Sequence, residues 1–247
     1  MHNPLKTPWA ERRSQPAAFD GGRSWLSILP LVLSLIAGST DTIGFLSLNG
    51  LFTAHITGNL VVLCARVING DSANFSYFLA VPVFALVLLI TRMFASGLER
   101  AGTATLQALL LLELLLLIGF LVCCVNCGQR FDANSGLAIA AGMFGVSAMA
   151  VQTALVQISL TKAPSTAVMT TNIAHFMLAL GELLTGRDDA AIAGARKRAI
   201  HIFPVILGFG IGCALGAAGQ SAYGSWSLAL PASLAMLAVA MSVMARH

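Results

Sequence analysis

The chain has 247 residues, of which 57% are hydrophobic and only 10% charged, and its mean hydropathy is +0.84. A soluble domain carries about 25% charged residues, so this composition excludes an ordinary soluble domain and predicts an all-α integral membrane protein. The net charge of +4 does not indicate nucleic-acid binding, because Lys and Arg gather at segment ends, where membrane topology explains them. The five cysteines are too few for a disulfide framework.

Residues 1–24 are polar and basic, and we expect them to form a disordered cytoplasmic tail. Two membrane regions follow, 25–126 and 136–245, and each contains four apolar segments bounded by turn-forming residues. The eight segments, predicted to form six to eight transmembrane helices, cover residues 25–47, 51–68, 76–97, 104–126, 136–159, 165–184, 200–219 and 226–245.

A stretch of about 30 residues occurs twice, at 37–67 and again 113 positions later at 150–180. The two copies align in sequence without a gap, so that a Thr-x-Asn motif lies at the same position in each. This recurrence predicts two tandem repeats. Internal repeats of membrane segments are typical of transporters, whose sites lie near the repeat interface.

Two membrane topologies agree with the distribution of Lys and Arg. If all eight segments cross, the repeats have the same orientation, and the basic residues left outside are Arg92, Arg100 and Lys162. If 51–68 and 165–184 are re-entrant, each half crosses three times, the repeats are inverted and only two arginines lie outside. Both arrangements keep both termini in the cytoplasm. The length of 51–68, about 18 residues, slightly favours full crossing.

Asp41 lies inside the first apolar segment, where a carboxylate costs several kcal/mol unless it is paired or hydrated. If two helices meet at the turn after it, then Asp41 and Asn59 lie about 13–14 Å from that turn at 1.5 Å per residue, and Thr57 is slightly shallower. These side chains predict a substrate or ion site near the midplane; the alternative is hydrogen bonding between helices. Ala154 occupies the position of Asp41 in the second copy, which favours a functional role for the carboxylate.

In the second copy, Gln152 and Asn172 flank the turn at Ala163 and Pro164 at a comparable depth, so we expect a polar band across the protein. Gly58 either breaks its helix for a ligand or allows close packing. The predicted substrate-binding residues are Asp41, His55, Thr57, Gly58, Asn59, Gln152, Thr170 and Asn172.

Charged and metal-binding side chains elsewhere are few. Counting from the turn between their segments places Arg92 and Glu113 at depths about 5 Å apart, so we expect an ion pair that is either structural or proton-coupled. His55 and His175 have no second ligand at i+3 or i+4, so we expect no metal. We expect the three cysteines at 123, 124 and 127 to pack as small apolar residues.

A glycine stripe marks the seventh segment, with Gly208, Gly212 and Gly216 at four-residue spacing. Such a stripe predicts close helix packing, either within the fold or between protomers of a homo-oligomer. The sequence contains no nucleophile elbow, P-loop, dinucleotide fingerprint or zinc-protease motif. We therefore expect neither an enzyme nor a bound cofactor.

The first copy, AGSTDTIGFLSLNGLFTAHITGNLVVL, resembles the signature of the YoaK family of bacterial integral membrane proteins, which is close to AGxxDAxGFLxLGGxFxxHMTGNxxxL. The second copy resembles that family's weaker downstream motif, although Thr171 stands where Gly is more usual, which weakens the argument for a backbone break there. The positions that match the first signature are Ala37, Gly38, Asp41, Gly44, Phe45, Leu46, Gly50, Phe52, His55, Thr57, Gly58 and Asn59.

The family is a domain of unknown function, so the resemblance implies a multi-pass protein of the bacterial inner membrane and supplies no substrate. From the repeats and the polar residues we expect a transporter or permease for a small solute, with the lipid bilayer and that solute as its partners. The alternative is a membrane scaffold or partner-binding protein, in which the same polar residues only hold helices together.

Overall fold

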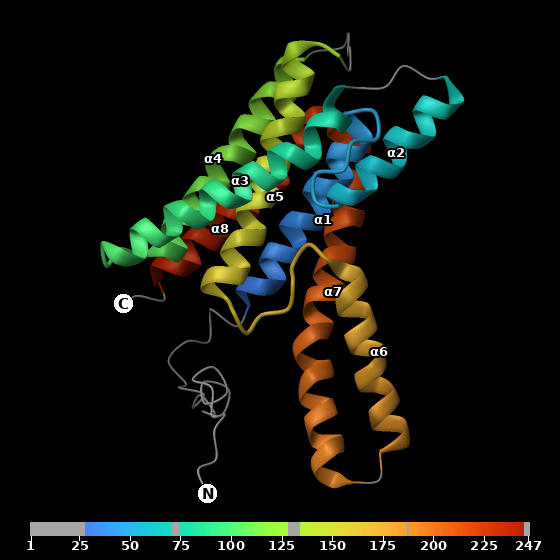
Figure 1. The fold of residues 1–247 in the computed structure, drawn as a ribbon, viewed down its shortest axis with the longest axis vertical. Coiled ribbons are helices and arrows are strands. Elements are labelled where there is room, and N and C mark those ends of the chain that lie inside the picture. The colour runs from blue at the N-terminus through green and yellow to red at the C-terminus, as the bar shows by residue number, and fades with distance from the viewer. Residues whose placement is uncertain (1–27, 71–74, 128–133, 187, 245–247) are drawn as a thin grey trace, which may run out of the picture.

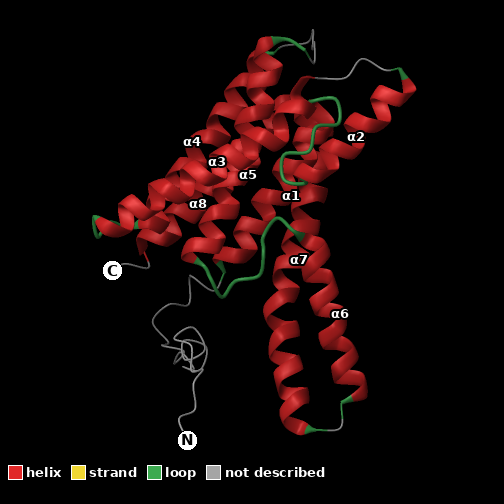
Figure 2. Ribbon diagram, viewed as in Figure 1, coloured by secondary structure: helices red, strands yellow, loops and turns green. Residues whose placement is uncertain are grey.

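The computed structural model describes residues 28–70, 75–127, 134–186 and 188–244, so the expected tail at 1–24 lies outside it. The regular elements in these ranges are all helical, which confirms the all-α expectation (Figure 2). In chain order they are α1 (Leu29–Ser47), α2 (Ile56–Asn69), α3 (Phe75–Arg100), α4 (Thr105–Asn126), α5 (Gly136–Ser159), α6 (Met169–Thr185), α7 (Asp189–Tyr223), the 3-10 helix η3 (Gly224–Leu228) and α8 (Ala229–Met244).

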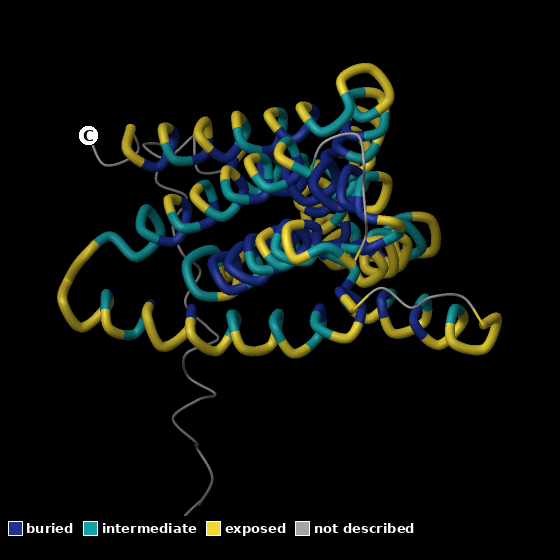
Figure 3. Tube along the Cα trace, turned by 90° about the horizontal axis from the view of Figure 1, so that it is seen from above, coloured by how far each residue is buried: buried dark blue, intermediate teal, exposed yellow. Residues whose placement is uncertain are grey.

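Five stretches of the described chain are long and apolar enough to cross a membrane. Four are α1, α3, α4 and α5, and the fifth is the continuous run 189–244 that contains α7, η3 and α8. Buried residues gather where the helices meet, whereas the outer faces are exposed (Figure 3). Those faces carry large apolar side chains such as Leu89 and Leu115, as expected of a multi-pass membrane protein whose solvent there is lipid.

The glycine stripe of α7 packs against α1 in the same chain. A Cβ on Gly208 would lie 3.0 Å from the backbone oxygen of Leu31, and one on Gly216 would lie 2.9 Å from that of Ser39. Residue numbers rise together along both helices, so α1 and α7 run parallel. Of the two alternatives for the stripe, the structure has packing within the fold, and α1 occupies the surface that a second protomer would need.

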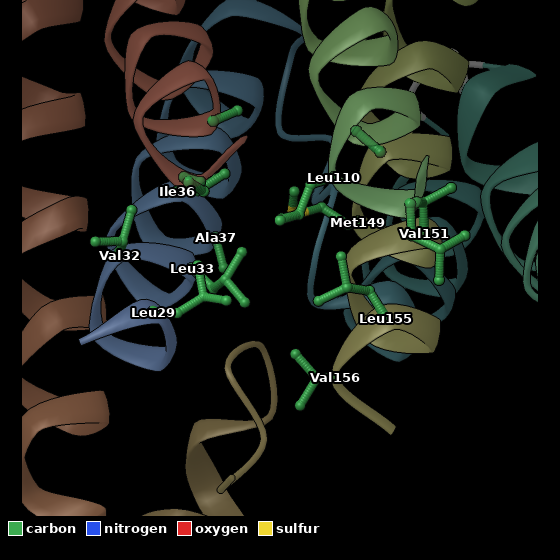
Figure 4. Close-up of a cluster of buried hydrophobic side chains, with 14 of the residues drawn as sticks. Leu29, Val32, Leu33, Ile36, Ala37, Leu110, Met149, Val151, Leu155 and Val156 are labelled. Atoms are coloured by element: carbon green, nitrogen blue, oxygen red, sulfur yellow. The ribbon is translucent and has the colours of Figure 1, made fainter. Parts of the chain in front are cut away.

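Helices α1 and α5 run antiparallel. The late residue Gln152 of α5 donates a hydrogen bond to the early carbonyl of Leu33 in α1 at 2.9 Å, while a Cβ on the early Gly145 would meet Thr53, which follows α1. Between these ends the helices are held by a fully buried apolar layer that includes Ile36 and Met149 (Figure 4). The C-terminal ends of α1 and α5 therefore lie at opposite ends of the bundle.

The segment after α1 does not cross the bundle, so the slight preference for full crossing is wrong. Helix α2 has only 14 residues, about 21 Å at 1.5 Å per residue, and the residues before Ile56 are not helical. Near the end of α2, Arg66 donates to the carbonyl of Asn49 at 2.9 Å. Tyr77, in the first turn of α3, donates to the same carbonyl at 2.5 Å. Helix α2 therefore returns to the turn that the chain left after α1.

The segment after α5 also consists of a nonhelical stretch followed by a short helix. Helix α6 has 17 residues and starts only at Met169, after a nonhelical stretch. It runs beside the first half of α7, where Glu182 pairs with Arg198, and the α6–α7 hairpin projects from the other helices (Figure 1). The predicted loop before residue 200 is instead mostly helix, because Asp188 accepts from the backbone N–H groups of Ala190 and Ala191 and starts α7 early.

Candidate functional site

The Asp41 carboxylate of α1 is buried and accepts hydrogen bonds from the chain that leads into α2. Its Oδ1 accepts from the backbone N–H groups of Thr53 and Ala54, each at 2.7 Å, and the Thr53 hydroxyl lies 3.3 Å away. Its Oδ2 lies 2.6 Å from Nδ1 of His55. The start of a helix leaves backbone N–H groups unsatisfied, and α2 has no capping side chain of its own. Asp41 accepts from the two residues before the N-cap and, at 3.5 Å, from the backbone N–H of the N-cap His55. It also places near the start of α2 a negative charge that the helix dipole favours.

Asn59 fixes the other side of this nonhelical stretch. Its Oδ1 accepts from the backbone N–H of Phe52 at 2.9 Å, and its Nδ2 donates to the Phe52 carbonyl at 2.8 Å. Both backbone groups of Phe52 are satisfied in this way, as a neighbouring strand would satisfy them. The Asn59 side chain is fully buried, so its role in this structure is to hold the backbone.

A cleft of about 490 Å³ opens beside this arrangement, and we call it the first cleft. The imidazole of His55 lies on its wall with 42% of the side chain exposed. Phe52 and Phe209 approach the ring edge-on, with centroid distances of 5.9 and 5.7 Å. The residues that line the first cleft are Asp41, Thr42, Phe45, Leu46, Phe52, His55, Thr57, Gly58, Phe209 and Cys213.

The contact with Asp41 determines what His55 offers to the first cleft. An ionised carboxylate only accepts hydrogen bonds, so we assign the proton of the neutral ring to Nδ1, which faces Oδ2. That leaves Nε2 as an acceptor with no partner among the residues that the structure describes. A half-exposed imidazole in this tautomer can accept a hydrogen bond or a proton from a molecule in the cleft.

The second nonhelical stretch, before α6, is held by neutral amides instead. Gln152 donates through Nε2 to the Leu33 carbonyl and, at 2.8 Å, to the hydroxyl of Thr166. Asn172 donates to the Ser165 carbonyl at 2.6 Å, and these two residues are seven apart, as are Asn59 and Phe52. Both amide side chains are buried.

The eight predicted site residues fall into two groups rather than one band. Asp41 follows Leu33, the partner of Gln152, by eight residues on α1, about 12 Å along the helix axis. Thr57 and Gly58 line the first cleft together with Asp41 and His55. Thr170 is exposed on α6 and lines neither cleft found in the described chain.

The expected ion pair between Arg92 and Glu113 is wrong. Arg92 lies 3.6 Å from Glu99, two turns along its own exposed face of α3. Glu113 is fully buried, and neither of its carboxyl oxygens has a hydrogen-bond partner in the described chain. Depth counted from a turn gives the level of a side chain in a helix but not its direction, and these two side chains point to different surroundings.

Two residues of the first cleft, Phe209 and Cys213, were not predicted. Both come from α7, far along the chain from α1. The signal that could have found them is the glycine stripe, because Gly208 and Gly212 bring α7 against α1 and the residue after each glycine lies beside the cleft.

The remaining candidates for a metal or redox site are the histidines, acidic residues and cysteines outside the first cleft. Within the described ranges no three His, Cys, Asp or Glu side chains lie close enough to share a metal ion. The cysteines near the end of α4, Cys123, Cys124 and Cys127, carry free thiols.

Comparison with known proteins places the chain in a family without supplying an activity. No curated protein matches it, and no solved structure matches it. The family model described as "Protein of unknown function (DUF1275)" matches residues 29–241. Because this match covers most of the chain, the protein belongs to the DUF1275 family, to which the YoaK-type motif of its sequence also points.

Proposed function

We propose that this protein is a transporter or permease for a small solute, and that the first cleft binds the solute. One observation carries the proposal: His55 presents a half-exposed imidazole to a cleft of about 490 Å³ while its other ring nitrogen is held by a buried carboxylate. Buried ionisable residues in membrane proteins mark solute paths and proton relays more often than they serve packing.

The pair formed by His55 and Asp41 gives the cleft a way to exchange one proton. Neutral His55 accepts a proton at Nε2 from the side to which the cleft opens. The resulting imidazolium lies 2.6 Å from the Asp41 carboxylate, which balances its charge, and the ring then donates rather than accepts at Nε2. Proton uptake thereby changes the hydrogen-bonding group that the cleft presents to a solute, so proton binding and solute binding are coupled.

We also infer that the two halves are inverted repeats. Each half has a long helix, a nonhelical stretch and a short helix whose amide residue, Asn59 or Asn172, bonds to the backbone seven positions earlier. The long helices α1 and α5 run antiparallel, which supports opposite orientations of the halves. Discontinuous helices of this kind form the solute sites of many transporters with inverted repeats.

We place the protein in a bacterial inner membrane with both termini in the cytoplasm. Basic residues support this orientation, since Arg100 is the last residue of α3 and Lys162 follows α5, on the side where α1 begins. Arg66 lies at the opposite end, beside the turn after α1. Cytoplasmic loops of membrane proteins are the ones enriched in Lys and Arg.

The test is the thermal stability of the purified protein in detergent, measured against a panel of solutes and pH values for wild type, His55→Gln and Asp41→Asn. A solute that binds only the folded state raises the melting temperature by mass action. We expect a solute that stabilises wild type, loses its effect in His55→Gln and, in proteoliposomes, enters together with protons. A stabilising solute whose effect and uptake survive in both variants would exclude the His55–Asp41 pair from its site.

The alternative function, a scaffold that transports nothing, is favoured by one observation. The carboxylate of Asp41 and the amide of Asn59 are both occupied by backbone groups of the same chain. This function predicts that no solute in the panel shifts the melting temperature, that His55→Gln melts as wild type does, and that Asp41→Asn loses stability at every pH.

A further inference from the structure

A second cleft of about 250 Å³ lies beside the nonhelical stretch that precedes α6, and no role is yet assigned to it. We call it the second cleft. Its walls come from the last third of α5 and from the connection between α5 and α6. The residues that line it are Thr153, Val156, Gln157, Leu160, Thr161, Ala163, Ser165, Thr166 and Ala167.

The two clefts lie at opposite ends of the bundle. The first cleft is bounded by Asp41 to Leu46, near the end of α1, and the second by Thr153 to Leu160, at the end of α5. Because α1 and α5 are antiparallel, these ends face opposite sides of a membrane that the helices cross. Between them lies the apolar layer in which Ile36 of α1 and Met149 of α5 are fully buried (Figure 4).

The second cleft is built for hydrogen bonding without charge. Three hydroxyl side chains and one amide side chain line it besides Thr166, and no acidic or basic residue of the described ranges does. Thr166 is 1% exposed and its hydroxyl accepts from Nε2 of Gln152. That nitrogen also donates to the Leu33 carbonyl, which can only accept, so the orientation of the amide is fixed.

The remaining atom of that amide is unsatisfied. Oε1 of Gln152 is buried and has no donor anywhere in the described chain, although a buried acceptor without a partner costs about 1–3 kcal/mol. Gln152 itself does not line the cleft, but the Thr166 hydroxyl does and accepts from its Nε2. That hydroxyl keeps its own proton to donate, so this wall suits a molecule with hydroxyl or amide groups.

We propose that the second cleft is a second binding site for the transported solute, open to the opposite side of the membrane from the first, and that this solute is a small neutral molecule rich in hydroxyl or amide groups. The inference rests on the proposed function, because it assigns the transported solute two binding sites, one near each side of the membrane. The first cleft agrees with the solute class in its protonated state, because its lining charges are then the His55 imidazolium and the Asp41 carboxylate, which balance each other. A charged solute would find no counter-ion among the residues that line the second cleft, and none left unpaired in the first cleft once His55 is protonated.

The test uses thiol labelling of the full chain in sealed membrane vesicles of known orientation. Cys213 is the native thiol of the first cleft, and Ser165→Cys supplies one for the second; each is retained alone, with all other cysteines replaced by alanine. Gly210→Cys is the matched control, since it lies one turn from Cys213 on an exposed face of α7 with nothing within 4 Å of a Cβ there. A membrane-impermeant thiol reagent is applied from either side, with and without a panel of glycerol, erythritol, urea and acetamide, and of choline and acetate as charged counterparts.

We expect Cys213 to react from one side only, Ser165→Cys from the other side only, and Gly210→Cys from neither. We also expect one neutral solute that raises the melting temperature to slow both reactions about fivefold or more, while choline and acetate slow neither. Reaction of both thiols from the same side overturns the inference. A stabilising solute that protects Cys213 but not Ser165→Cys also overturns it and leaves the proposed function standing. Two thiols of opposite sidedness that no solute protects, with no solute stabilising the protein, overturn the proposed function and this inference with it.

Discussion

The two nonhelical stretches that interrupt this bundle occupy matching places in its halves but are held by different chemistry. The stretch before α2 is fixed by a carboxylate, Asp41, and by an amide, Asn59, that satisfies both backbone groups of one residue. The stretch before α6 is fixed by neutral Gln152, which keeps one orphan acceptor, and by Asn172, which makes a single bond to the backbone. We therefore expect the nonhelical stretch before α2 to be held more firmly than the stretch before α6, and the stretch before α6 to change its conformation at a lower free-energy cost.

Removing the carboxylate of Asp41 should have the largest effect on the difference between the two halves. In Asp41→Ala the N–H groups of Thr53 and Ala54 lose their acceptor inside the protein, and we expect the free energy of unfolding to fall by about 3–5 kcal/mol. Asp41→Asn keeps an acceptor oxygen at that place and should lose about 1–2 kcal/mol. Denaturant-dependent circular dichroism of the purified variants measures both values. Gln152→Ala is the control in the second half, and a loss there as large as that of Asp41→Ala would contradict the difference between the halves.

A single methyl group between α1 and α7 should disturb the first cleft and leave the second cleft unchanged. A Cβ on Gly38 would lie 2.2 Å from the Phe209 carbonyl oxygen, so in Gly38→Ala the two helices must separate, at about 1–3 kcal/mol. The wall of the first cleft moves with them, and labelling of Cys213 should change while labelling of Ser165→Cys does not. Gly210→Ala is the control, because that position has open space and alanine favours the helix by about 1 kcal/mol.

The two asparagines offer a smaller and more direct contrast. Asn59→Ala leaves both backbone groups of Phe52 without partners, so we expect a loss of about 2 kcal/mol. Asn172→Ala leaves only the Ser165 carbonyl, and the loss should be about 1 kcal/mol. Thermal melting of the two variants in the same detergent gives the ranking. If Asn172→Ala were the less stable variant, the second stretch would be the more firmly held one.

The smallest effects concern the ion pair that does not form. Arg92→Ala removes an exposed side chain and should change stability by no more than about 0.5 kcal/mol. Glu113→Leu replaces a buried carboxyl that has no partner in the described chain, so the variant should be as stable as wild type or more stable, by up to about 1 kcal/mol. Similar losses in both variants, with coupling in the double variant, would restore the pair.

The helical class and a buried carboxylate at Asp41 that needs partners could be predicted from the sequence, because apolar length and the cost of a buried carboxylate are local properties. The depth argument failed in detail. It counted 1.5 Å per residue on both sides of the turn after α1, whereas an extended chain advances about 3.3 Å per residue. Residues 51–55 are not helical, so the chain advances faster there and reaches the level of Asp41 at Thr53 to His55, before Thr57 and Asn59.

The direction of side chains could not be predicted by the same counting. Arg92 and Glu113 were matched by level, but the side that each faces depends on how α3 and α4 pack on the rest of the bundle. Likewise, Phe209 and Cys213 enter the first cleft through a contact between helices far apart in sequence. No periodicity within one helix contains that information.

The contact between Gly38 and Phe209 joins residues about 170 positions apart, which has a consequence for how the protein is made. At a synthesis rate of about 5–20 residues per second, α7 leaves the ribosome roughly ten to thirty seconds after α1. During that interval α1 waits in the membrane without its main neighbour, carrying a carboxylate. The partners of Asp41 at Thr53 and Ala54 are only 12 and 13 residues downstream, so the charge is satisfied almost as soon as it is inserted.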